Sequence, residues 1–158
     1  MNRIGFDPAT ADHATPQYRP GELFTQHGKI YRYVQAQDVG TIAISTGTVL
    51  RWANDVTEMD KVTADRSASL ADSETKPAGV AVSTPTADYY FFMQVSGYHP
   101  AIKTNGDDDL AAGVRLMPEA DGTVNTMAAG SEHLAFATTV AADVDGDNTV
   151  AAIIDGIL

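Results

Sequence analysis

The segment "DVDGDN", residues 143–148, carries the residue types of a calcium loop. An EF-hand loop has oxygen ligands at positions 1, 3, 5, 7, 9 and 12, a glycine at position 6 and a bidentate glutamate at position 12. Counted from Asp143, the next two aspartates fall at positions 3 and 5, but Gly146 falls at position 4 and Ile154 at position 12. This mismatch favours a turn between two strands, because Asp-Gly is a common hairpin turn. A weak cation site in this loop stays open as the alternative.

A second acidic segment, "GDDD" at residues 106–109, could offer carboxylates to a metal ion or to acid–base chemistry. Adjacent side chains in a strand point to opposite faces, so these carboxylates do not converge on one ion by themselves. We therefore interpret this segment as a hydrated loop.

The histidines and the known catalytic motifs give no further sign of chemistry. The four histidines are His13, His27, His99 and His133, and none has a ligand spacing such as H-x-H or H-E-x-x-H. We expect each of them to be an ordinary surface or turn residue, with His99 in a turn of sequence Gly-Tyr-His-Pro. There is no cysteine, no G-x-S-x-G motif and no phosphate-binding glycine loop. The sequence thus predicts a protein that is not an enzyme and that has no catalytic residue, cofactor or resident metal.

The charge of the chain is strongly negative and unevenly distributed. The 158 residues have a formal net charge of −11, and residues 104–158 contain 10 acids and a single base, Arg115. Such a surface repels phosphate backbones, so direct binding to nucleic acid is not expected. The acids either form a solvated surface or meet a basic partner. No apolar run is long enough to span a membrane, and the N-terminus lacks the apolar segment of a secretory signal.

The elements that would position these residues are short strands. Turn signals recur about every eight to twelve residues between runs rich in β-branched and aromatic residues, and no long helical period is present. This spacing predicts an all-β protein, a compact β-sandwich or barrel with an extended N-terminal arm. The expected elements are a hairpin in 21–37 around "QHG", strands at 42–44, 49–50, near Val62, 79–82, 89–95 and 101–104, two strands around 118–122, and strands at 134–140 and 149–158.

Residues 1–20 form the predicted arm, and residues 21–158 the β-rich domain. Prolines at positions 8, 16 and 20 forbid a continuous helix or a central strand. Such a segment is disordered alone or becomes ordered by lying across another surface.

The segment "YYFFMQV", residues 89–95, is apolar on both faces of a strand. Tyr89, Phe91 and Met93 fall on one face, and Tyr90 and Phe92 fall on the other. We interpret it as a strand buried on one side by the core and on the other by a second subunit or layer. A sugar-stacking platform is the alternative.

Three segments together resemble the capsid decoration, or cement, proteins of tailed bacteriophages. They are "GKIYRYVQA", "AGVAVSTPTADYYFFMQVSGYHPAI" and "AAGSEHLAFATTVAADVDGDNTVAAII". The middle segment carries most of the resemblance, with a Gly-Val-Ala strand, a short turn and an aromatic strand that ends in Met-Gln-Val. The resemblance covers most of residues 22–158, and the arm lies outside it.

The resemblance implies a β-rich subunit, often trimeric, that binds the major capsid protein on the outer surface of a virion and stabilises the expanded shell. The arm would lie along a neighbouring subunit, and removing residues 1–18 would abolish capsid binding while leaving the fold intact. A carbohydrate-binding or fibre-associated β-sandwich module, with Trp52 and the tyrosines as its platform, is the alternative function. The residues expected to make contacts are Ile4, Phe6, Tyr18 and Arg19 for the arm on the capsid, and Trp52, Tyr90 and Phe92 between subunits.

Overall fold

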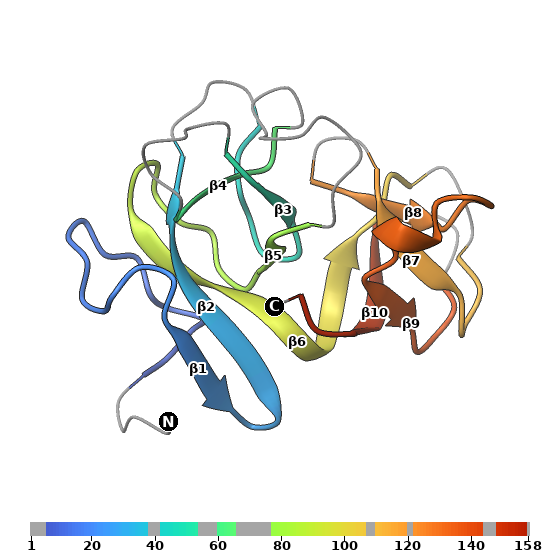
Figure 1. Ribbon diagram of the computed structural model, residues 1–158, viewed down its shortest axis with the longest axis horizontal. Helices are drawn as coiled ribbons and strands as arrows, with labels where there is room; N and C mark the ends of the chain where they lie inside the picture. The colour runs from blue at the N-terminus through green and yellow to red at the C-terminus, as the bar shows by residue number, and fades with distance from the viewer. Residues whose placement is uncertain are drawn as a thin grey trace.

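The computed structural model describes residues 6–37, 42–53, 60–65, 77–106, 110–119, 122–143 and 148–157. In this part of the chain the all-β prediction is confirmed, since one short 3-10 helix accompanies ten strands (Figure 1). No helix among these residues is long and apolar enough to cross a membrane. The elements are β1 (Leu23–Gln26), β2 (Lys29–Ala36), β3 (Val49–Trp52), β4 (Lys61–Thr63), β5 (Gly79–Ala81), β6 (Tyr90–Lys103), β7 (Arg115–Pro118), β8 (Val124–Thr126), η2 (Glu132–Leu134), β9 (Ala137–Thr139) and β10 (Thr149–Ile154).

Five strands close into a small ring on one side of the molecule. β2 pairs with β4 in parallel, β4 with β3, β3 with β5, β5 with β6, and β6 with β2 again, all but the first antiparallel. The hydrophobic cluster inside draws on every strand of the ring, as Val34, Leu50, Val62, Ala81 and Phe91 show. A closed ring has no free edge, which makes this half of the molecule a barrel rather than a sandwich.

The other strands form a second lobe beside the barrel (Figure 1). β6 continues out of the barrel and pairs with β10, which pairs with β9, then β7, then β8. A bridge between Thr104 and Val124 brings β8 back to the end of β6. A second hydrophobic cluster, with Ile102, Leu116, Phe136 and others, fills this lobe.

Strand β6 is shared by both lobes, and this differs from the sequence-based expectation. Two strands with a turn at Gly-Tyr-His-Pro were expected, but β6 runs through all 14 residues. Register shifts opposite Ile30/Tyr31 and opposite Val150/Ala152 give β6 an extra residue at each place, and such bulges bend a strand. Gly97 takes a positive φ of 93°, and Pro100 falls in the second irregularity, where a missing N–H is tolerated.

The side chain of Gln94 stabilises the first bend of β6, the one opposite Ile30 and Tyr31. It is 1% exposed, and its Nε2 lies 3.1, 3.0 and 3.1 Å from the carbonyl oxygens of Ser96, Gly97 and Tyr98. The side-chain amide of Gln94 thus supplies hydrogen-bond donors to three successive backbone carbonyls at the bend.

Substituting Gln94 by leucine is therefore expected to lower the free energy of unfolding by about 2 kcal/mol, because buried acceptors lose their donor while side-chain volume is kept. Gln94→Glu should cost more, since it turns a carboxylate towards carbonyl oxygens. Urea unfolding of the two variants beside the parent tests this. A leucine variant as stable as the parent would show that water replaces the amide.

The hairpin predicted around "QHG" is present as β1 and β2. Its two turn residues, His27 and Gly28, have φ values of 51° and 76°, and two successive positive φ angles match the right-handed twist of a tight hairpin. The strand near Val62 and the two strands flanking 118–122 are also confirmed. The expected strand at 134–140 is shorter, because the 3-10 helix η2 takes Leu134.

Candidate interaction surfaces

Arm residues 6–20 lie against the chain's own barrel rather than away from it. Phe6 packs its ring against Phe24 of β1 and Phe92 of β6, with centroid distances of 5.0 and 4.5 Å. Tyr18 adds edge contacts to Phe24 and Tyr33 at 5.0 and 5.2 Å. We call this set the aromatic cluster; its buried members are Phe6, Ala11, Phe24, Tyr31, Tyr33 and Phe92.

Hydrogen bonds also connect arm residues 6–20 to the rest of the chain. His13 and Tyr90 exchange two backbone hydrogen bonds of 2.9 Å, which extend the sheet by one bridge. The Asp12 carboxylate accepts hydrogen bonds from the backbone N–H and the hydroxyl of Thr86, at 2.9 and 2.7 Å. The buried Tyr33 hydroxyl lies 2.8 Å from His13 Nδ1, and burial raises the pKa of this tyrosine. The surface that orders residues 6–20 is thus the chain itself.

The arm explains why "YYFFMQV" is apolar on both faces. Phe91, Met93 and Val95 point into the barrel cluster, whereas Phe92 belongs to the aromatic cluster outside the barrel. The second layer that the sequence required is formed by the arm and β1. Phe92 is 1% exposed and Phe6 is 6% exposed, so both rings are used within the chain and present little surface to a subunit or a capsid.

The other described residues predicted to make contacts are more exposed to solvent than Phe6 and Phe92. Arg19 is exposed on the arm, and Tyr18, Trp52 and Tyr90 are partly exposed, whereas Ile4 lies outside the described residues. The Arg32 guanidinium lies 5.5 Å from the centre of the Trp52 ring, a cation–π contact that already covers one face of the indole. Tyr90 is stacked on Tyr33 in the aromatic cluster, whereas Trp52 packs on the barrel cluster. Trp52 and Tyr90 are therefore parts of two different clusters and not of one stacking platform.

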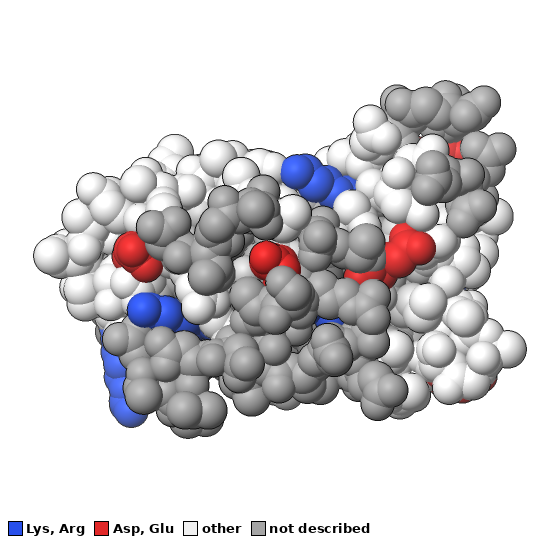
Figure 2. Space-filling model, turned by 90° about the horizontal axis from the view of Figure 1, so that it is seen from above, with Lys and Arg blue, Asp and Glu red and all other residues white. Residues whose placement is uncertain are grey.

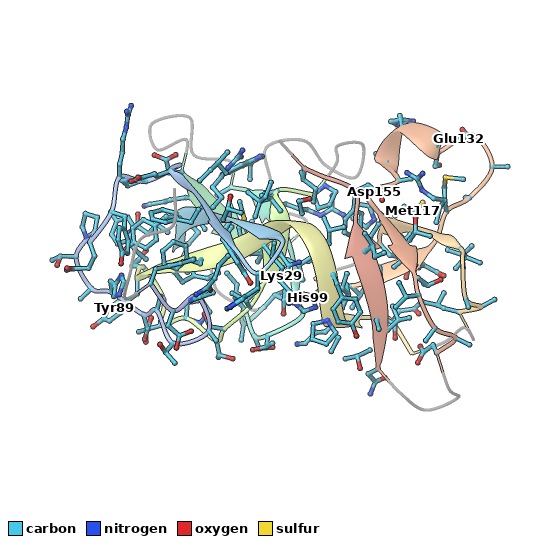
Figure 3. All side chains as sticks on the ribbon, turned by 90° about the horizontal axis from the view of Figure 1, so that it is seen from below. Lys29, Tyr89, His99, Met117, Glu132 and Asp155 are labelled. Atoms are coloured by element: carbon cyan, nitrogen blue, oxygen red, sulfur yellow. The ribbon has the colours of Figure 1, made fainter. Side chains whose placement is uncertain are left out.

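His99 is a core residue, so the expectation of a surface or turn histidine was wrong. Its side chain points inward from β6 and is 2% exposed (Figure 3). Its Nδ1 accepts a hydrogen bond of 3.2 Å from the Ala101 N–H. Burial, with a smaller contribution from the Lys29 ammonium, lowers the pKa of His99 to about 4. The imidazole is neutral at physiological pH and serves packing.

The described residues do not assemble a metal centre. No group of three or more His, Asp or Glu side chains converges among them. Of the two acidic loops, Asp107–Asp109 and residues 144–147 lie outside the described part of the chain. Their flanks run side by side, since the Thr104 N–H donates to the Asn148 carbonyl at 3.0 Å. β9 and β10 pair antiparallel, as the turn interpretation of the last loop requires of its flanking strands.

The outer face of the second lobe is a surface that sequence reasoning missed. Among the described residues four large hydrophobic side chains are exposed: Leu23 at 43%, Tyr98 at 47%, Val140 at 44% and Ile153 at 46%. Tyr98, Val140 and Ile153 share one face of the β6–β10–β9 sheet, because Tyr98 pairs with Ile153 and Ile153 with Thr138, two residues before Val140. The sequence contained one indication of this surface. Ile153 and Ile154 are adjacent in a strand, so one of the two side chains has to point into the core and the other towards solvent.

Among the described residues, charged side chains are spread over the face seen from above. Figure 2 shows several separate areas of Asp or Glu side chains and of Lys or Arg side chains on this face. Six of the ten acids of residues 104–158 lie outside the described residues, and the others are Glu119, Glu132, Asp143 and Asp155. Asp155 forms an ion pair with Arg115 at 3.3 Å.

Comparison with known proteins gives a match in fold alone. No protein-family model matches the chain, and no curated protein matches it in sequence. The fold is similar to the crystal structure of the head fibre gp8.5 N base in bacteriophage phi29, with a TM-score of 0.55 and 15% sequence identity. The similarity covers 80% of this chain and 94% of that one, so it includes both lobes rather than one barrel.

Proposed function

We propose that this chain is a structural protein of a bacteriophage virion, attached to the outer surface of the head. The observation that carries the proposal is the fold shared with the base of a phage head fibre over most of both chains. The resemblance of three sequence segments to capsid decoration proteins leads independently to the same class of particle.

The proposed role is to bind the major capsid protein and stabilise the expanded shell, as a homotrimer. A protein that binds the assembled lattice and not the separated subunits stabilises the lattice by mass action. Three linked copies bind more tightly than one, because the second and third contacts form at a high effective concentration.

The test uses heads of the phage that encodes the chain. The proposal expects the chain in purified virions, and it expects heads stripped of the chain to rebind it and then to dissociate at a higher temperature. A chain that is present in the infected cell but absent from virions contradicts the proposal. Binding to heads with no change in their dissociation temperature would favour a fibre-associated module instead.

Arg19 is an exposed cation on the arm, so a single substitution at this position tests whether the arm contacts the capsid. Arg19→Ala is expected to weaken binding to stripped heads about fivefold, because an exposed interfacial charge contributes on the order of 1 kcal/mol. Gln17→Ala is the matched control, since Gln17 is also exposed on the arm and its side-chain amide donates a hydrogen bond of 3.4 Å to the nearby Thr15 carbonyl. Co-sedimentation across a concentration series gives the two affinities. Equal affinities for Arg19→Ala and the parent would remove Arg19 from the contact.

A further inference from the structure

We draw no further inference here: the strongest candidate, the exposed apolar face of the second lobe formed by Tyr98, Val140 and Ile153, carries no proposal, because nothing in the structure shows what covers it.

Discussion

Replacing Phe6 by alanine is expected to destabilise the folded chain by about 3 kcal/mol or more, the usual cost of truncating a buried phenylalanine. The ring is 6% exposed and contacts Phe24, Tyr31 and Phe92, with centroids within 5.7 Å. Its loss leaves a space in the aromatic cluster that the chain fills poorly, because the facing residues belong to paired strands. The free energy of unfolding in urea, for the parent and the variant, checks this expectation.

The matched control is Arg19→Ala on the same arm. Arg19 is exposed, so its truncation should change the free energy of unfolding by no more than about 0.5 kcal/mol. If Phe6→Ala were as stable as Arg19→Ala, the arm would not be part of the folded domain in solution.

Because the arm packs on the rest of the chain, removing the arm is expected to lower the stability of the fold as well as to remove a capsid contact. Removing residues 1–18 deletes Phe6 and Tyr18 together and breaks the bridge between His13 and Tyr90. We expect the truncated chain to unfold at a markedly lower urea concentration than the parent, rather than to keep its stability as the sequence suggested. Loss of capsid binding on truncation would therefore report on folding as well as on contact, which is why point variants such as Arg19→Ala are the sharper test.

Local patterns in the sequence were sufficient for several of the short elements, although the strand expected at 42–44 is not formed. The β1–β2 hairpin follows from a two-residue turn whose Gly28 accepts a positive φ, and β7 and β8 follow from the turn signals between them. These elements depend on neighbours within a few residues, so a single sequence contains most of the information that specifies them.

The largest errors came mainly from contacts between residues that are distant in the sequence. The course of β6 past Gly97 is set by Gln94, by β10 and by two bulges, and a Gly-Tyr-His-Pro segment read alone indicates a turn. Arm residue Phe6 lies 86 positions from Phe92 in sequence, so the partner that covers the second face of the aromatic strand was not visible from local spacing. The exposed row of Tyr98 and Ile153 likewise depends on the register between β6 and β10, which no local pattern specifies.

His99 is expected to make the stability of the chain depend on pH between about 6.5 and 4. The pKa is 6.5 for an ordinary histidine and about 4 in the folded chain, because burial and the nearby Lys29 ammonium disfavour the charged ring. Above pH 6.5 both states are neutral, and His99 has no effect. As the pH falls below 6.5 the unfolded chain binds a proton and the folded chain does not, so the folded state loses stability. The loss is complete near pH 4, where the folded chain is also protonated.

The geometry gives the cause of this resistance to protonation. Nδ1 accepts the Ala101 N–H at 3.2 Å, so a proton on Nδ1 would set two donors against each other inside the core. The lowered pKa of His99 corresponds to a change of about 3 kcal/mol in the free energy of unfolding, and about 2 kcal/mol of this stability is lost between pH 6.5 and 5.

Urea unfolding at pH 7 and pH 5 tests this, with His99→Gln and His27→Asn as comparison variants. The glutamine variant should be less stable at pH 7, yet its stability should change less between the two pH values, because it has no group at position 99 to protonate. His27→Asn, at the exposed hairpin turn where asparagine tolerates the positive φ, should keep the pH dependence of the parent. If His99→Gln and the parent lose equal stability on acidification, the dependence comes from the carboxylates and not from His99.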